Sequence, residues 1–212
     1  LINYYMIIRL IFGILIINAL STSSLSGKIN PNEKFVVVLD AGHGGRDSGN
    51  RGNGYYEKNI ALNIALKVGA ILEKANDIKV IYTRKKDVFV DLIQRANIAN
   101  KADADLFISI HCDAFTSSKA FGAGTFVLGL HENERNFKVA QKENSVIFLE
   151  EDYEKKYDGF NPNDPESVIS LILMQETYLD QSINAANTIQ KSFVNNLKRK
   201  DRSVKQAGFV VL

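Results

Sequence analysis

The stretch Phe35-Val-Val-Val-Leu-Asp-Ala-Gly-His-Gly-Gly45 decides the fold that is predicted for this chain of 212 residues. Its first five residues are apolar and mostly β-branched, which predicts a short buried strand. A glycine-rich turn follows directly, and from Glu57 an isoleucine, leucine or valine recurs every three to four residues as far as Ile71, which predicts an amphipathic helix. A strand, a turn and a helix in succession indicate a protein of alternating strands and helices.

The rest of the chain continues this alternation. Strands are predicted at residues 79–83, 105–110 and 124–128, and helices at residues 91–101 and from Pro165 to about Leu197, with Asp164 as N-cap. The sequence therefore predicts an α/β fold with a mostly parallel, twisted sheet and helices on both of its faces. Residues 132–165 are charged, which predicts an excursion from the core, and residues 206–212 have the pattern of an apolar strand.

Residues 1–27 have the features of a secretory signal peptide. Arg9 precedes an apolar run from Leu10 to Leu20, and the small polar residues 21–24 follow it. The run is shorter than the ~20 apolar residues of a spanning helix, and an uncleaved membrane anchor is the alternative. We therefore expect export to a periplasm or a cell surface, no stable membrane span after cleavage, and one domain in residues 28–212.

The composition excludes several classes of protein. Lys and Arg number 26 and Asp and Glu number 24, and this balance gives no reason to expect nucleic acid as a partner. Cys112 is the only cysteine, so an intrachain disulfide is impossible. The histidines are His43, His111 and His131, which leaves few candidates for a histidine metal site.

Three candidate metal ligands lie next to the predicted strands. His43 is in the turn after the first strand, Glu57 begins the following helix, and His111 comes directly after the strand at 105–110. Because the carboxyl ends of parallel strands meet at one edge of a sheet, these side chains can meet there. Two imidazoles and one carboxylate are the ligands of a catalytic zinc site with an open position for water. The alternative is that the histidines only cap turns and that Glu57 only complements the helix dipole.

Several motifs, taken together, resemble the family 3 zinc N-acetylmuramoyl-L-alanine amidases. They are Val38-Leu-Asp-Ala-Gly-His-Gly-Gly45, Asp47-Ser-Gly49, Glu57-Lys-Asn59, Thr83-Arg84, Arg95-Ala-Asn97, Ser109-Ile-His-Cys-Asp-Ala114 and Val204-Lys-Gln-Ala207. The resemblance spans roughly residues 35–212, in the family's order. It implies a sheet of about five to six strands and one zinc ion, Zn2+, held by His43, Glu57 and His111.

The same resemblance implies an activity. The family hydrolyses the amide between N-acetylmuramic acid and L-alanine of the stem peptide, so peptidoglycan, the cell-wall polymer, is the expected partner. The family also carries a general-base glutamate on its last strand, and this strand is missing from residues 28–212. The catalytic glutamate is thus expected beyond residue 212, and the chain as given is expected to be nearly inactive, because general-base help contributes about 10² to 10⁴ in rate.

Residues 132–183 form an insert relative to the family's common core. In the daughter-cell-separation branch of the family, an insert at this place carries a helix that blocks the zinc site until an activator protein displaces it. The resemblance in position and acidity implies the same autoinhibition here, with an activator as a further partner. Glu150 or Glu151 is expected to take the open zinc position. The alternative is a solvated acidic loop.

Further roles are predicted around the expected metal. Asp40 is a candidate to orient His43, and Ser109 or Asp113 to orient His111, since imidazole ligands commonly donate their second N–H to an acceptor. A structural role, rather than binding of substrate carboxylates, is favoured for Arg84, Asp87 and Arg95.

Two other functions stay open. A different zinc peptidase, such as a carboxypeptidase, would share the three ligands but not the whole order of motifs. A non-catalytic module that binds the cell wall would keep the pocket for recognition alone.

Overall fold

The computed structural model describes residues 33–113, 120–130, 133–173 and 178–212. The predicted signal peptide, residues 1–27, and His131 lie outside these residues. Residues Phe35–Leu212 form one compact unit, to which the following description refers. None of the helices in the described ranges is long and apolar enough to cross a membrane.

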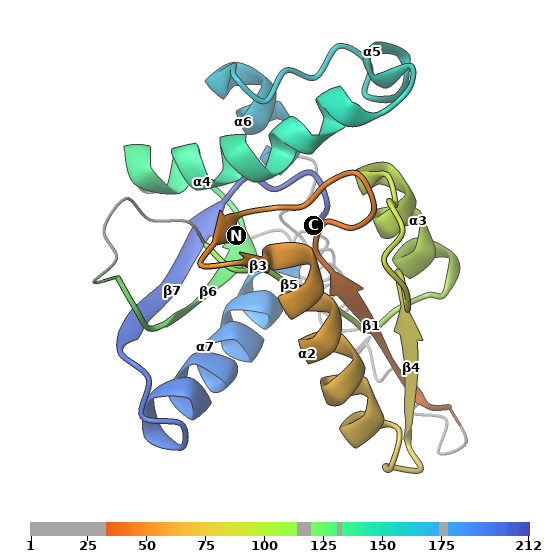
Figure 1. The fold of residues 1–212 in the computed structure, drawn as a ribbon, viewed down its shortest axis with the longest axis vertical. Helices are drawn as coiled ribbons and strands as arrows, with labels where there is room; N and C mark the ends of the chain where they lie inside the picture. Colours follow the sequence, from red (N-terminus) through yellow and green to blue (C-terminus); the bar gives the residue numbers. More distant parts are fainter. Residues whose placement is uncertain (1–32, 114–119, 131–132, 174–177) are drawn as a thin grey trace, which may run out of the picture. The chain divides into compact units, whose positions relative to one another are not determined.

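A parallel sheet of three strands lies at the centre of the unit (Figure 1). Its strands are β1 (Phe35–Ala41), β4 (Ile78–Tyr82) and β5 (Leu106–Ile110), in the order β4-β1-β5. Val38 of β1 lies opposite Ile81 on one side and Phe107 on the other. The apolar run quoted at the start of the sequence therefore becomes the middle strand, where both edges are paired and its residues from Val37 on are buried.

A second parallel pair consists of β6 (Ala123–Leu128) and β7 (Asp201–Ala207). Five parallel strands thus confirm the predicted α/β class, although in the described ranges they hydrogen-bond as two separate groups. The strand predicted at residues 206–212 is wrong in its bounds. β7 begins at Asp201 and ends at Ala207, and residues 208–212 leave the strand and turn into the core. Polar residues suit β7 because several of its positions are exposed or half-buried.

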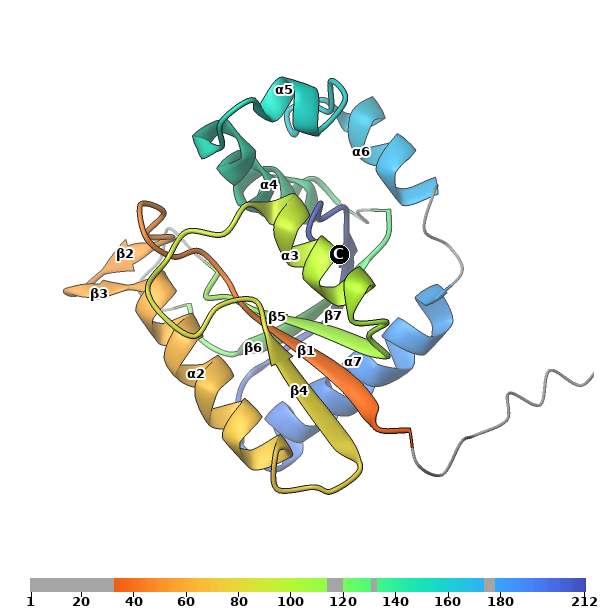
Figure 2. The same cartoon turned by 90° about the vertical axis from the view of Figure 1, so that its right-hand side faces the viewer.

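Helices cover both faces of β1 (Figure 2). They are α2 (Glu57–Leu72) and α3 (Leu92–Lys101). Successive side chains of a strand point to opposite faces, so Ala41 packs against Ala61 and Ala65 of α2, whereas Asp40 pairs with Arg95 of α3. The short antiparallel hairpin of β2 (Arg51–Gly52) and β3 (Tyr55–Tyr56) leads into α2.

The remaining helices follow β6 in the chain. They are α4 (Glu134–Asn144), a 3-10 helix at Ser145–Leu149, α5 (Tyr153–Lys156), α6 (Pro165–Leu173) and α7 (Leu179–Asn195). The predicted start at Pro165 is confirmed, and Asp164 accepts hydrogen bonds from the Glu166 N–H and the Ser167 hydroxyl. The single helix predicted as far as Leu197 is described as α6 and α7, and α7 packs against β6 and β7.

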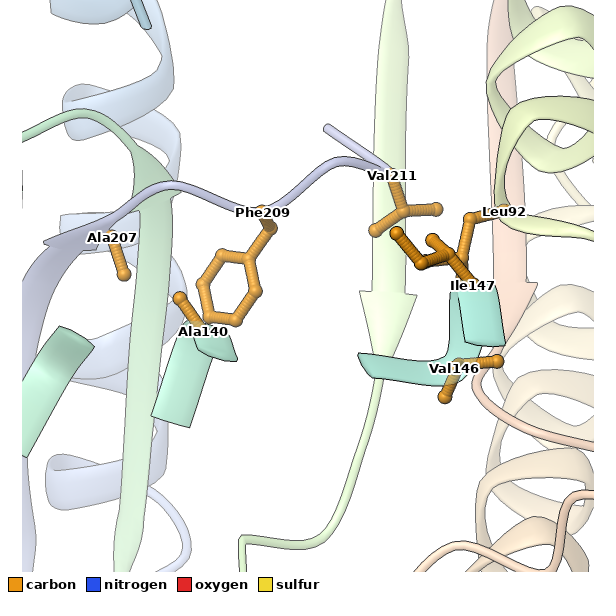
Figure 3. Close-up of a cluster of buried hydrophobic side chains, with 7 residues drawn as sticks. All are labelled: Leu92, Ala140, Val146, Ile147, Ala207, Phe209 and Val211. Carbon is orange, nitrogen blue, oxygen red and sulfur yellow. The ribbon is translucent and has the colours of Figure 1, made fainter. Parts of the chain in front are cut away.

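The segment from α4 to the 3-10 helix is part of the core rather than an excursion from it. Its side chains join a cluster of seven buried apolar residues (Figure 3): Leu92, Ala140, Val146, Ile147, Ala207, Phe209 and Val211. The sequence does not show this core role, because most residues of the segment are charged or polar and only a few small or aliphatic side chains face inward. The cluster fixes α4 beside the carboxyl end of β7 and the start of α3.

Candidate metal centre

The turn after β1 places His43 at the edge of the sheet. His43 has a left-handed backbone, with φ 61°, and its imidazole is buried. A side chain at Gly42 would bring a Cβ atom within 2.4 Å of the His111 ring, so only glycine allows the two imidazoles to lie close together. The ring centroids of His43 and His111 are 4.8 Å apart.

Two arginines hold the backbone of this turn from beneath. Arg84 donates to the carbonyl oxygens of Ala41 and Gly42, and Arg95 donates to those of Ala41 and His43, at 2.8 Å in each case. Arg95 also forms a fully buried ion pair with Asp40. Asp87 accepts from the Gly45 N–H and pairs with Lys58. The structural role predicted for Arg84, Asp87 and Arg95 is therefore what the described contacts show.

Glu57 is the first residue of α2, and hydrogen bonds fix both of its carboxylate oxygens. Oε2 accepts from the backbone N–H and the side-chain amide of Asn50 at 2.9 and 2.7 Å. Oε1 accepts from the Cys112 N–H at 2.6 Å. The carboxylate thereby links the loop before α2 to the residues just after β5, and the contribution of Cys112 comes from its backbone rather than its thiol.

The three predicted ligands come together, and Glu143 of α4 joins them. His43 Nε2 lies 3.1 Å from Glu57 Oε1 and 3.4 Å from Glu143 Oε2. His111 Nδ1 lies 3.3 and 3.2 Å from the same two oxygens. One donor atom from each of the four residues lies within 4.8 Å of the other three.

The geometry of the two imidazoles fits a bound metal ion. Within the described part of the chain, His43 Nε2 and His111 Nδ1 are buried and form no hydrogen bond of acceptable geometry. Buried polar nitrogens without such a bond are rare in proteins and require an explanation. Both nitrogens lie within 3.4 Å of carboxylate oxygens of Glu57 and Glu143, and imidazole nitrogens with carboxylate oxygens are donors that zinc binds.

The electrostatics of the cluster favour positive charge. Burial lowers the pKa of His43, but the carboxylates of Asp47 and Glu57 outweigh it and raise this pKa to about 9. Burial also lowers the pKa of His111, while Glu143 and Glu57 raise it to about 10. Burial raises the pKa of Glu57, yet the two histidines hold it well below its usual range. A divalent cation would balance the negative charge of these carboxylates, just as protons on the two imidazoles do.

The residue that orients His43 is Asp47, which the sequence prediction missed. His43 Nδ1 and Asp47 Oδ2 are 2.7 Å apart, and both side chains are buried. The prediction that Asp40 orients His43 is wrong, because Asp40 is buried beneath the turn and its oxygens accept from Thr83, Arg95 and Ser109. Ser109 is thereby also engaged away from His111.

Glu150 and Glu151 do not take the fourth position, contrary to the prediction. Glu150 is buried at the start of α3, where it accepts from the Leu92 N–H and from the Tyr157 hydroxyl at 2.9 Å. Glu151 is exposed. Glu143 lies at the metal centre because α4 runs across the edge of the sheet and presents its last turn to the two histidines.

The family of this chain follows from comparison with known proteins. Residues 37–212 match the family profile described as Amidase_3, N-acetylmuramoyl-L-alanine amidase. The chain belongs to this family. The resemblance inferred from the motifs is thus confirmed.

Curated members of the amidase family are similar over most of this chain. The amidase AmiA of Escherichia coli strain K12 is 36% identical over 183 residues, which cover 84% of this chain and 61% of AmiA. The amidase AmiC of Escherichia coli O6:H1 is 34% identical, over 88% of this chain and 44% of AmiC. The chain therefore spans about half to three fifths of the length of these two relatives.

Solved structures of the amidase family share the fold. The N-acetylmuramoyl-L-alanine amidase from Clostridium difficile 630 superposes with a TM-score of 0.60 at 26% identity, covering 85% of this chain and 73% of that one. The catalytic domain of CwlV from Bacillus (Paenibacillus) polymyxa gives a TM-score of 0.54 at 28% identity, with coverage of 83% and 72%.

Proposed function

We propose that this protein is a zinc-dependent hydrolase of peptidoglycan that cleaves the amide between N-acetylmuramic acid and L-alanine of the stem peptide. The observation that carries the proposal is the pair of buried imidazole nitrogens that face Glu57 without a hydrogen bond. Membership of the amidase family supplies the substrate class. His43, Glu57 and His111 would hold one zinc ion.

Each group in the site has a defined part in this function. A bound zinc ion supplies a Lewis acid that polarises the scissile carbonyl and lowers the pKa of water. Asp47 holds the His43 ring so that Nε2 faces the centre, and Asn50 with Cys112 fixes the Glu57 carboxylate. The general-base glutamate implied by the resemblance stays a prediction, since it concerns a residue beyond those described.

Glu143 makes the site self-blocking in this proposal. In a zinc-loaded site the carboxylates of Glu57 and Glu143 would together offset the two positive charges of the ion, which would leave little attraction for a substrate carbonyl. Moving α4 away would remove one negative charge and expose the open position that a catalytic zinc requires. We therefore propose that the insert, residues 132–183, is autoinhibitory through Glu143 and that an activator protein displaces α4.

Product analysis tests the proposed function. Sacculi digested over a long incubation with the zinc-loaded product of the whole gene, in which the general-base glutamate is expected, should yield new L-alanine amino termini, at a low rate while α4 covers the centre. Release of a free amino acid from the end of the stem peptide would instead indicate a carboxypeptidase, and new amino termini within the stem peptide would indicate another zinc peptidase. Binding to sacculi with no hydrolysis, even after Glu143 is replaced by alanine, would indicate a wall-binding module and contradict the proposal.

Localisation is proposed from the substrate and from the sequence. Peptidoglycan lies outside the cytoplasmic membrane, and residues 1–27 have the charge and apolar order of a signal peptide. We propose that the protein is exported to a periplasm or a cell surface. Fractionation of cells that express the whole gene, followed by N-terminal sequencing of the mature protein, tests this.

A further inference from the structure

The side-chain amide of Asn50 contacts three separate parts of the chain at the candidate metal centre. Its Nδ2 donates to Glu57 Oε2 and to the Cys112 carbonyl oxygen, at 2.7 Å in each case. Its Oδ1 accepts a hydrogen bond from the ammonium group of Lys142, in the last turn of α4. Each of these three partners is one of the four clustered residues or is next to one in the chain. One half-buried side chain therefore joins the start of α2, the residues after β5 and the insert.

The partners of Asn50 fix the orientation of its amide. A carboxylate and a carbonyl oxygen only accept hydrogen bonds, and a lysine ammonium only donates them. The nitrogen must therefore face Glu57 and Cys112, and the oxygen must face Lys142. The backbone N–H of Asn50 also donates to Glu57 Oε2, at 2.9 Å. Oε2 is thereby engaged on the loop, and Oε1 is the oxygen that lies 3.1 and 3.3 Å from the two imidazole nitrogens.

Three successive residues in the last turn of α4 contact three different segments. Lys142 donates to Asn50, and Glu143 lies at the two histidines. Asn144 is buried, and its side chain forms hydrogen bonds of 2.7 and 2.9 Å with backbone groups of residues 208–210. Lys142 is exposed, so water can replace its bond to Asn50 without leaving a buried polar group unpaired. The contact between Lys142 and Asn50 is therefore one that α4 can break and form again.

We propose that Asn50 is a positioning residue with two effects. Its amide nitrogen orients Glu57 for the metal ion, and its amide oxygen holds α4, and with it Glu143, over the centre through Lys142. The inference rests on the proposed function, because it concerns the ligand set and the autoinhibitory helix of that same site. Loss of the ammonium of Lys142 should only loosen α4. Loss of the Asn50 side chain should loosen α4 and also weaken metal binding.

Hydrogen–deuterium exchange of the backbone amides in the last turn of α4 tests the effect on the helix. A chelator is present, so the readout depends on neither metal nor turnover. Lys142→Met keeps the length of the side chain and removes the donor, and Asn50→Ala removes the acceptor. Each should speed exchange by about three- to tenfold, the size expected for the loss of one hydrogen bond. Lys142→Arg, which restores a donor, should exchange as slowly as the parent protein.

A double variant and a control complete this experiment. Lys142→Met added to Asn50→Ala should exchange no faster than Asn50→Ala alone, because both changes remove the same bond. Lys138→Ala is the control, since Lys138 lies one turn earlier on α4 and is exposed. Unchanged exchange in both single variants, or a further increase in the double variant, would overturn the proposed hold on α4.

Zinc affinity in a Glu143→Ala background tests the effect on Glu57, because α4 then contributes no ligand. Asn50→Ala should weaken zinc binding by about 10- to 100-fold in this background. Lys142→Met should not change it, and neither should the control Asn63→Ala, which removes an exposed asparagine of α2. Unchanged affinity in Asn50→Ala, or an equal loss in Lys142→Met, would overturn the assigned division of roles.

Two further comparisons separate the possible causes of failure. Melting temperatures of the variants should match those of their parent proteins, which separates lost positioning from misfolding. If the product analysis fails while the exchange and zinc results hold, the proposed hydrolysis is wrong and the role of Asn50 stands. If the product analysis succeeds while these two results fail, only the role of Asn50 is wrong.

Discussion

At the scale of single residues, the candidate metal centre depends on side chains that orient the predicted ligands. Asp47 is the clearest case, because its carboxylate lies 2.7 Å from His43 Nδ1 and its pKa is held below the usual range by the histidine, against the effect of burial. Partners of this kind fix the ring and the tautomer of a histidine ligand.

Replacing Asp47 by alanine should therefore weaken zinc binding by about 10- to 100-fold without unfolding the protein. Zinc affinity measured by competition with a chromophoric chelator checks this. Asp180→Ala, which removes an exposed carboxylate in the first turn of α7, serves as the control. An affinity equal to that of the parent protein would show that Asp47 does not position His43.

The sequence predicts the candidate ligands better than it predicts the residues that position them. His43, Glu57 and His111 each lie within four residues of the end of a predicted element, so the topology of a parallel sheet is enough to bring them together. Asp47 belongs to a motif that the sequence singles out, but its role depends on a loop geometry with left-handed residues that no periodicity encodes. Glu143 was missed because the position of α4 over the sheet follows from packing far along the chain.

At the scale of elements, α4 places Glu143 beside the two histidines of the candidate metal centre. Its buried Ala140 packs in the core cluster, and Glu143 lies one turn further on at the two histidines. The last turn of the helix also contacts the loop before α2, through a hydrogen bond from Lys142 to the Asn50 side chain. The helix is thus attached on both sides of the centre.

Glu143→Ala should raise the rate of peptidoglycan hydrolysis and lower zinc affinity, because it removes a ligand and opens a coordination position. The rate of appearance of L-alanine amino termini and a zinc titration check the two effects. Glu134→Ala is a matched control on the same helix, since Glu134 is exposed and forms an ion pair with Lys138, one turn further along α4. A rate that falls instead would mean that Glu143 takes part in catalysis.

Glu150 ties the insert to α3, and its contribution should depend on pH. Burial raises the pKa of Glu150 above its usual value, although the Leu92 N–H and the Tyr157 hydroxyl oppose this. A raised pKa in the folded state means that the folded protein binds the proton more tightly than the unfolded chain. The resulting stabilisation is present below the ordinary glutamate pKa and is lost as the pH rises through the raised value.

The difference in unfolding free energy between the parent protein and Glu150→Gln should therefore move against the parent as the pH rises from about 4 to neutrality. Denaturant unfolding of both proteins at a series of pH values measures it. The glutamine keeps the size of the side chain and does not ionise. A difference that stays constant across this range would show that Glu150 does not titrate with a raised pKa.

At this scale the sequence predicts elements better than their ends and partners. The strand predicted at Phe35–Leu39 and the helix predicted from Glu57 follow from their apolar patterns, and both are confirmed, with the strand continuing to Ala41. The bounds of β7 were wrong because a strand with exposed positions is polar there and resembles a loop. The sequence did not predict that the 3-10 helix packs in the core, because only two of its residues, Val146 and Ile147, are buried there.

At the scale of the whole unit, the four clustered side chains come from four separate places: the turn after β1, the start of α2, the end of β5 and the last turn of α4. An ion held by all of them would cross-link the central sheet to the insert. Because a preformed set of ligands exists only in the folded chain, binding free energy adds to the free energy of unfolding.

Zinc at about 1,000 times its dissociation constant should therefore stabilise the protein by about 4 kcal/mol and raise the melting temperature by roughly 10 °C. Calorimetry with zinc, and again after a chelator is added, measures the shift. The shift should vanish in His111→Ala, while Lys138→Ala should keep it, since Lys138 lies on the exposed side of α4. An equal shift in His111→Ala would place the ion elsewhere.

The guanidinium groups of Arg84 and Arg95, which bind the turn after β1, affect how the candidate metal centre forms. Arg84 and Arg95 donate hydrogen bonds to three successive carbonyl oxygens, and the imidazoles take no part in these bonds. The turn is thus shaped before any ion arrives, and coordination requires no refolding of the scaffold. If the candidate centre binds a divalent ion, exchange of that ion for another should therefore leave the backbone of this turn unchanged.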